Sequence, residues 1–547
     1  MAKRRKHKLT EYEKLLRQFH KQSSRHVLVL EADMLYQDKC MVAHMADLDR
    51  KAGNELTDIM KAAYEQLIRT KKYRKLQSLY GAYKQKEDEK RCKLIAGQMA
   101  QMQEQYHVTW DYCRTSMISI GKKYKLDAIF ALTKAEDVWR AVETCLYSDG
   151  KALHFAKRGD LPVIRAKQIN RGIIIGSKDG RLKVTFNGIP FGVKVRDRFE
   201  TEEVNAILQY LKQPEAADRH AVKTMQEQSL CISTYRPCYV SLVCKTIRGK
   251  LRVYVHITIE GTALPKYDKL GNKKHTLGKG IIGCDIGTQT IAYTSDKEVG
   301  LKNLAERGSA IITNERKERR LGRAMDRSKR AANPEYYNDD GTIKKGKKNW
   351  KYSNRYRKLK ARHQEFCRIN AINRHLAIRE DVNHLRSLGD IFVTEPQNAK
   401  KLQKRAQKTT VDKNGKINRK KRFGKSIQNR CPGYFQAQIE QKFTQTGGQY
   451  IEVPKQYRAS QYDHPSGTFI RKKLSARMYR LSDGTLVQRD WYSSFLLYCI
   501  DFEQLAIDRS KCIKSFQQQY TKEKALIEWI RANQIRVCNS GIRIAAD

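Results

Sequence analysis

Apolar and polar residues follow one pattern in the first 150 residues and another in the next hundred. Residues 41–106 are rich in Met, Ala, Leu, Lys, Glu and Gln and carry almost no strand or turn signal, so we expect residues 1–150 to be mostly helical. The run HVLVLE at 26–31 predicts a short strand before these helices. Between 162 and 260 the chain changes to short β-rich runs, the last two of which flank a turn at 246–250. This interval predicts a small antiparallel barrel or sheet.

The second half of the chain mixes strands with helices. A polar, glycine-containing linker at 264–280 opens it, and a loop at 333–348 carries Asn-Pro and Asp-Gly turn signals. We expect strands at 281–286, 391–394 and 450–453, and helices at 314–332, 350–388, 434–446 and from Asp490 onward. The chain is therefore predicted to be an α/β multidomain protein.

The charge of the chain points to a polyanionic partner. Its 547 residues include 109 Lys and Arg against 58 Asp and Glu, which gives a formal net charge of +51. Solubility alone needs a net charge of only about 2–8 on a small domain. Nucleic acid is the natural partner, because each phosphate that a cation neutralises releases condensed counterions. Forty per cent of the residues are hydrophobic, which is enough for packed cores and excludes a disordered basic tail.

The compartment follows from what the sequence lacks. No run of 18 or more apolar residues occurs, and the charged N-terminus has no apolar stretch of the kind found in signal peptides. We expect a cytoplasmic, nucleoid-associated protein of a prokaryotic cell with no membrane partner. Thirteen cysteines are scattered without a Cys-x-x-Cys pair, so neither a thiolate zinc site nor a disulfide framework is expected.

Basic residues concentrate in two places. Residues 401–430 carry twelve Lys and Arg against one acid and should be mobile without a ligand. The predicted helix at 314–332 carries cations around most of its circumference, as expected of a helix that lies between nucleic-acid strands; a solvated charged face is the alternative. The candidate nucleic-acid-binding residues are Arg316, Arg319, Arg320, Arg323, Arg327, Arg330, Lys404, Arg405 and Arg489.

Three acids stand out by their context. Asp285 ends an apolar strand within Gly-Cys-Asp-Ile-Gly, Glu395 follows a second apolar strand, and Asp490 begins an apolar helix. Each alone is more often a turn, cap or surface-pair residue. Together they can converge if the two strands are neighbours in one sheet. Three carboxylates can hold two Mg²⁺ ions, or Mn²⁺ in their place, about 3.5–4 Å apart and clamp the attacking and leaving oxygens of a phosphodiester.

The order of these motifs resembles the split RuvC nuclease domain of TnpB, a transposon-encoded RNA-guided nuclease whose domain is shared by compact type V CRISPR effectors. The match covers roughly residues 279–500. It rests on Gly-x-Asp-x-Gly, strand-Glu and Gly-x-x-x-x-Arg-Asp, and on the connecting segments LGRAMDRSKR, NPEYYN, DGTIK and NRYRKL.

The resemblance implies an RNA-guided DNA endonuclease with one RNase H-like active site, in which Asp285, Glu395 and Asp490 bind magnesium. It implies a guide RNA, target double-stranded DNA and a displaced single strand as partners, with one or two protein copies per RNA left open. The implied domains are an N-terminal arm with the first wedge strand at 1–32, a helical recognition lobe at 33–155, a small β-barrel wedge domain at 156–278 and the RuvC-like domain at 279–547. The last contains a basic helical insert at 311–388, a basic loop at 398–430 and a target-nucleic-acid-binding segment at 458–486.

The sequence departs from the TnpB pattern twice. The family carries two cysteine pairs in a zinc knuckle before its last Asp, but here the four positions read Asp463, Ser466, Arg480 and Asp483, so no zinc is expected. The segment should persist through packing or contacts with RNA. The family's Asn-Ala-Ala after the last Asp appears here as Tyr-Ser-Ser at 492–494.

Three other functions remain open from the sequence. A guided DNA-binding protein that no longer cuts would share the fold, and a DNA-joining enzyme would use the same carboxylates. An actin-like ATPase or sugar kinase would share Asp-Ile-Gly-Thr at 285–288 but needs a second Asp-x-Gly-Gly loop, which the sequence lacks.

Overall fold

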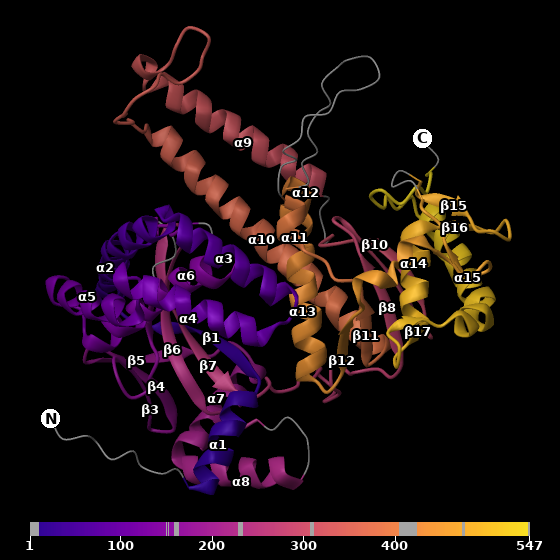
Figure 1. Ribbon diagram of the computed structural model, residues 1–547. Helices are drawn as coiled ribbons and strands as arrows, with labels where there is room; N and C mark the ends of the chain where they lie inside the picture. The colour runs from indigo at the N-terminus through magenta and orange to yellow at the C-terminus, as the bar shows by residue number, and fades with distance from the viewer. Residues whose placement is uncertain are drawn as a thin grey trace. The chain divides into compact units, whose positions relative to one another are not determined.

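The computed structural model describes residues 10–148, 150, 152–157, 163–227, 233–306, 311–403, 424–472 and 476–544 (Figure 1). The chain folds into two compact units, 1–264 and 265–547. None of the helices in the described part is both long enough and apolar enough to cross a membrane.

Helices form most of the first part of unit 1, as predicted. Apolar side chains recur along one face of each helix, and residues such as Leu56, Met60, Val138 and Val142 fill a shared core. Asp127 illustrates the local signals, because its side chain accepts the backbone N–H of Ile129 and caps the last of these helices. The helices are α1 (Glu11–Gln22), α2 (Tyr36–Arg69), α3 (Lys71–Gln85), α4 (Glu89–Gln105), α5 (Trp110–Lys123) and α6 (Ala128–Tyr147).

A seven-stranded antiparallel sheet completes unit 1, in the order β2-β6-β7-β1-β5-β4-β3. The predicted strand at 26–31 lies within β1, in the middle of this sheet, although most of its partners come more than 150 residues later. The turn predicted at 246–250 joins β6 to β7 through Arg248 and Gly249, both with positive φ. Closure into a barrel stays a prediction. The strands are β1 (Arg25–Asp33), β2 (Val163–Ala166), β3 (Ile173–Lys178), β4 (Arg181–Phe186), β5 (Ile189–Lys194), β6 (Pro237–Ile247) and β7 (Lys250–Glu260), joined by α7 (Arg198–Lys212) and α8 (Pro214–Glu227).

Unit 2 is built on a five-stranded mixed sheet in the order β10-β9-β8-β11-β12. β9 runs antiparallel to both of its neighbours, β8 and β10, whereas β8, β11 and β12 run parallel. The strands expected at 281–286, 391–394 and 450–453 are confirmed. The five strands are β8 (Ile281–Ile286), β9 (Thr290–Ser295), β10 (Val299–Asn303), β11 (Ile391–Thr394) and β12 (Gln449–Glu452).

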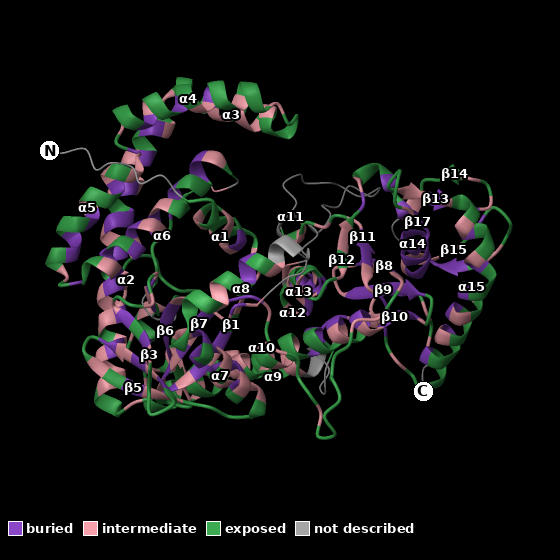
Figure 2. Ribbon diagram, turned by 90° about the horizontal axis from the view of Figure 1, so that it is seen from below, coloured by how far each residue is buried: buried purple, intermediate pink, exposed green. Residues whose placement is uncertain are grey.

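Helices cover both faces of this sheet. On one face Ile282, Cys284 and Phe392 pack against α10 (Asn354–Leu388) and α13 (Pro432–Gln445). On the other face lie α14 (Arg489–Tyr498) and α15 (Arg509–Ala532), which share a core with Val393. Figure 2 shows α14 largely buried, and every residue from Trp491 to its end at Tyr498 is buried. Because strand side chains alternate between faces, Gly283 and Asp285 lie on the α14 side.

Two long helices form a hairpin that lies between β10 and β11 in the chain. α9 (Ile311–Ala331) packs against α10, and the buried Asn333 fastens the intervening loop, since its side chain bonds Lys329 and Lys351 backbone groups. The remaining short elements are η1 (Pro334–Tyr336), α11 (Ala399–Gln403), α12 (Gly424–Arg430), η2 (Lys455–Tyr457), η3 (Ala459–Gln461), β13 (Tyr462–Asp463), β14 (Thr468–Phe469), β15 (Met478–Arg480), β16 (Leu486–Gln488), β17 (Ile500–Asp501) and β18 (Ala506–Ile507).

Candidate active site

Two neighbouring parallel strands bring Asp285 and Glu395 to the same edge of the sheet of unit 2. Thr394 of β11 pairs with Cys284 of β8, so the next residue on each strand is one of the two acids. The carboxyl ends of parallel strands meet at one edge, which places the two carboxylates side by side. The sequence predicted this arrangement on the condition that the strands were neighbours, and that condition holds.

The third acid arrives on α14, which approaches β8 unusually closely. A Cβ atom at Gly283 would lie 2.2 Å from both the Ser494 carbonyl oxygen and the Tyr498 nitrogen, so only glycine fits this contact. The hydroxyls of Ser494 and Thr294 share a hydrogen bond of 2.8 Å that fixes α14 against β9. Asp490 occupies the first turn of this helix and is carried to the same region as Asp285.

The three acids interact electrostatically. Burial raises the pKa of Asp285 well above its usual range, and the negative charges of Asp490 and Glu395 raise it further. Burial also raises the pKa of Glu395, although a 2.9 Å hydrogen bond from the Ala459 N–H and the positive charge of Arg489 oppose the shift. The structure therefore brings the three predicted acids together, with Arg489 beside them.

Two neighbours of this acidic site were missed by the sequence analysis. Arg477 Nη1 lies 3.5 Å from Asp490 Oδ1, and the Arg489 N–H donates to the Arg477 carbonyl in continuation of the β15–β16 pairing. Gln397 Nε2 donates to the Ile286 carbonyl, while its own buried Oε1 has no partner in the described structure. No local sequence signal marks either residue, because both contacts depend on tertiary packing.

The three carboxylates are not drawn onto a single point. Within the described ranges, a compact group of three possible metal ligands is formed instead by Glu318 on α9 and by His363 and Cys367 on α10. The ligand atoms of these three side chains all lie within 4.8 Å of one another. This mixed group was not predicted, and its surroundings are rich in Lys and Arg.

Two turns of the segment at 458–486 are joined by one buried carboxylate. Asp463 accepts hydrogen bonds from the backbone N–H and hydroxyl of both Ser466 and Ser482. Burial alone would raise the pKa of Asp463, but the hydrogen bonds from Ser482 and Ser466 outweigh it and hold the pKa below its usual value. At the second turn, Arg480 Nη1 donates to the Gly484 carbonyl and Asp483 accepts the Thr485 N–H.

The Tyr-Ser-Ser departure is part of the same packing. The hydroxyl of Tyr492 accepts the backbone N–H of His464 at 3.0 Å and lies 2.8 Å from its Nδ1. Tyr492 thus ties the segment that contains Asp463 to α14, which carries Asp490.

The predicted basic residues fall into two groups. On α9, Arg316, Arg319, Arg320, Arg323, Arg327 and Arg330 are all exposed, whereas Leu321 and Met325 are half-buried. Arg319 lies near Glu315, and Arg330 contacts the Gly341 carbonyl and the Tyr337 ring. Lys404 and Arg405, with most of the basic loop, lie outside the described residues.

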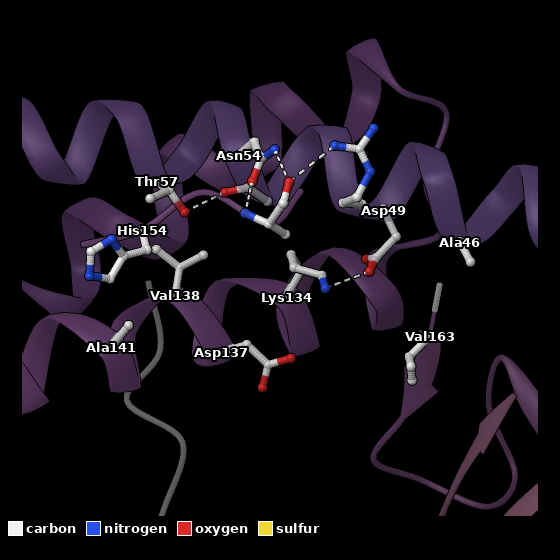
Figure 3. Close-up of a pocket in the computed structure, with 13 residues that line it drawn as sticks. Ala46, Asp49, Asn54, Thr57, Lys134, Asp137, Val138, Ala141, His154 and Val163 are labelled. Atoms are coloured by element: carbon white, nitrogen blue, oxygen red, sulfur yellow. Dashed lines mark hydrogen bonds and ion pairs between the residues drawn. The ribbon is translucent and has the colours of Figure 1, made fainter. Parts of the chain in front are cut away.

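A cavity of about 290 Å³ lies in unit 1 between α2 and α6 (Figure 3). Its charged groups are already paired, since Lys134 Nζ lies 2.6 Å from Asp49 and Asp137 pairs with Arg165. The amide of Asn54 is satisfied by the backbone of Ala156. Nothing in this wall marks a ligand site.

Neither protein-family models nor curated protein sequences match the chain. Among solved structures, the Cas12f1-sgRNA-target DNA complex aligns at 11% identity with a TM-score of 0.41, over 86% of this chain and 98% of that one. The Cas12i1 R-loop complex before target DNA cleavage aligns at 9% identity with a TM-score of 0.23, over 79% of this chain and 56% of that one. Such identities and TM-scores establish neither a family nor a function.

Proposed function

We propose that this protein is an RNA-guided DNA endonuclease that hydrolyses phosphodiester bonds at one RuvC-type site formed by Asp285, Glu395 and Asp490. The observation that carries the proposal is the convergence of these acids from two adjacent parallel strands and a facing helix. The sheet supports the proposal because Asp285 and Glu395 lie at the ends of β8 and β11, and Asp490 lies at the start of α14.

The acidic site fits divalent metal ions. Its donors are carboxylate oxygens, which Mg²⁺ and Mn²⁺ prefer, and the raised pKa of Asp285 and Glu395 reflects buried negative charge that a cation would relieve. Asp285, Glu395 and Asp490 would hold the metal. When bound, two such ions activate a water and stabilise the leaving oxygen.

The protein's own residues would orient the DNA. Arg489 reaches Asp285 and Glu395 electrostatically, and we infer that it and Arg477 bind the oxygens of the scissile phosphate. The close packing of α14 on β8 leaves no room at Gly283 for a larger side chain and fixes Asp490 relative to Asp285. The hydrogen bond from Ala459 orients Glu395.

Guide RNA, target double-stranded DNA and the displaced strand are the proposed partners. The net charge of +51 and the exposed α9 arginines support polyanion binding. By resemblance to TnpB, the wedge at 156–278 would bind the RNA scaffold, and the recognition lobe at 33–155 together with the wedge would read a short DNA motif beside the target. A cytoplasmic site of action is part of this proposal.

A guided DNA-binding protein without nuclease activity is the second candidate. It is favoured by the contact of Arg477 with Asp490, because an arginine that holds this carboxylate competes with a metal ion. Cleavage assays with and without Mg²⁺ separate the two.

The first experiment is to purify the protein from cells that carry its native flanking DNA and to sequence the RNA that co-purifies. The expected result is a discrete structured RNA ending in a variable segment, which then directs Mg²⁺-dependent cutting of matching DNA. Asp285→Ala should abolish cutting and preserve guided binding. Random RNA, or cutting retained in Asp285→Ala, would overturn the proposal, and a strand-transfer assay would detect a DNA-joining enzyme.

A further inference from the structure

A line of polar and cationic side chains follows the contact between α10 and α13. Arg379, Asn383 and Arg386 are spaced four and three residues apart, which places them on one face of α10. This face meets α13 where His375 stacks on Tyr434, with ring centroids 4.3 Å apart, and where Arg379 Nε donates to the Tyr434 hydroxyl at 3.2 Å. Two turns further along α13, Lys442 joins the line.

Arg386 is buried without a counter-charge. Its residue is only 5% exposed, and its buried Nε has no hydrogen-bond partner in the described part of the chain. No carboxylate among those residues forms an ion pair with Arg386 or with the half-buried Lys442. Burial lowers the pKa of Arg386, and burial together with the positive charges of Arg386, Arg379 and Lys266 lowers the pKa of Lys442. Buried charges in folded proteins are normally paired, so this arrangement is missing an anion.

The linker that precedes β8 contributes further side chains near Arg386 and Lys442. Gly278 donates its N–H to the Arg386 carbonyl at 2.7 Å, which fixes the linker along α10. His275 Nε2 lies 3.5 Å from Asn383 Nδ2, and the buried Asn383 Oδ1 has no partner among the described residues. Burial lowers the pKa of His275, as do the nearby charges of Lys442, Arg386 and Lys266. Cations from three chain segments therefore face one another.

We propose that Arg379, Arg386 and Lys442, with His275 and Lys266 beside them, form a phosphate-binding site that holds the backbone of a nucleic-acid strand away from the acidic site. We call these five residues the seam cluster. α10 and α13 cover one face of the sheet and α14 covers the other, so the seam cluster lies on the opposite face from Asp285 and holds a strand rather than cutting it. The identification of nucleic acid as the source of the phosphate rests on the proposed function, whereas the phosphate-binding site itself does not.

A nucleic-acid strand fits this site better than a single free phosphate. The cluster extends from the buried Arg386 through the half-buried Lys442 to the exposed Arg379 and His275. One inorganic phosphate can neutralise at most two of these charges, whereas successive phosphodiesters can meet a line of cations.

The test compares Arg386→Met and Lys442→Met with the parent, using the full chain stripped of nucleic acid at high salt. Thermal unfolding is measured first, and then binding of a labelled 20-nucleotide RNA, the matching single-stranded DNA and inorganic phosphate, without guide or metal. We expect each variant to raise Tm, because it removes an uncompensated buried charge. We also expect oligonucleotide binding to weaken about tenfold, with the slope of log K against log salt falling by about 1. Arg531→Met, at an exposed arginine of α15, is the matched control and should change neither property.

The outcomes separate the explanations. A lower Tm with unchanged oligonucleotide affinity in both variants would make these residues structural and overturn the proposal. If both variants lose binding of inorganic phosphate while their oligonucleotide affinity is unchanged, the site binds a free anion. That result would overturn nucleic acid as the source of the phosphate. Because these measurements need neither guide nor metal, their failure is distinct from failure of the proposed cleavage activity.

Discussion

The carboxylate of Asp463 accepts a 2.6 Å hydrogen bond from the hydroxyl of Ser482, nineteen residues further along the chain. The same carboxylate accepts the Ser466 hydroxyl at 2.7 Å. The two serines lie in the two turns where the resemblance to TnpB would place that family's pairs of zinc-binding cysteines. One buried side chain therefore joins two turns that a metal ion joins in that family, and this explains how the segment keeps its shape with none of the four cysteines.

Asp463→Asn should destabilise unit 2. The asparagine amide has the size of the carboxylate but no charge. Its NH₂ group replaces one of the two accepting oxygens with a donor, and this donor would face the N–H and O–H donors of the serines. Leaving such buried groups unsatisfied costs about 1–3 kcal/mol. Thermal unfolding should show a Tm several degrees lower, and Asp483→Asn, at an exposed acid that caps the second turn, should change it little.

The Asp463 carboxylate also sets a pH dependence. Its pKa is lowered in the folded protein, so its contribution to stability is complete above the ordinary carboxyl pKa of about 3.9 and is lost as pH falls through the lower folded value. The free energy of unfolding, measured against pH for both proteins, should therefore be higher for the parent than for Asp463→Asn at neutral pH. This difference should vanish in strong acid. A difference that persists unchanged into acid would contradict this account.

Asp285→Asn should stabilise the metal-free protein at neutral pH. A carboxyl group whose pKa is raised on folding lowers the stability of the protein as pH rises above the ordinary carboxyl pKa, so Asp285 costs stability at pH 7 and the neutral amide removes that cost. Adding Mg²⁺ should raise the Tm of the parent by mass action and leave that of the variant nearly unchanged.

The matching activity measurement is guided cleavage by the same preparations. Asp285→Asn should reduce cutting to background while guided DNA binding is retained. An unchanged response of Tm to Mg²⁺ in the variant would place the metal elsewhere, and Glu318→Gln would then test the group on α9 and α10.

The sequence was most informative where function depends on local pattern. Two short apolar strands ending in Asp285 and Glu395, with glycines around the first, predicted a shared edge, and the parallel pairing of β8 and β11 produces it. Asp490 was found because it begins an apolar helix, and the Gly283 that admits this helix lies in the motif that marked Asp285.

The sequence was least informative where function depends on partners distant in the chain. Arg477 reaches Asp490 only because the β15–β16 pairing carries it there. Arg386 has the sequence context of any arginine in a polar helix, and its burial results from the packing of α13. The sequence marked Asp463 only as a replaced cysteine position, and its hydrogen bonds with Ser466 and Ser482 were not foreseen, because the turns that hold the serines are defined by the fold.

Gly283→Ala should reduce DNA cleavage by displacing α14, which carries Asp490. The added methyl would lie 2.2 Å from backbone atoms of Ser494 and Tyr498, and backbone cannot move aside as a flexible side chain can, so α14 must shift and carry Asp490 with it. Overpacking of this kind costs about 1–3 kcal/mol, and a displacement of about 1 Å at an active site can cost about 100-fold in rate. Cleavage rate and Tm should both fall.

Gly322→Ala is the control for this change. Gly322 lies on α9, and nothing lies within 4 Å of a Cβ atom added there, so alanine should be neutral or stabilise the helix by up to about 1 kcal/mol. Equal loss of cleavage in both glycine variants would refute a specific role for the β8–α14 contact.

Arg323→Gln combined with Arg327→Gln should weaken nucleic-acid binding without affecting the fold. Both side chains are exposed on α9, and exposed charges contribute little to stability, so Tm should be unchanged. If each arginine meets one phosphate, the slope of log K against log salt should fall by about 2, and affinity should fall alike for all sequences. Arg531→Gln, at an exposed arginine of α15, is the control. An unchanged salt slope in the double variant would show that this face of α9 is simply solvated, and the charge that binds nucleic acid would then have to lie elsewhere on the chain.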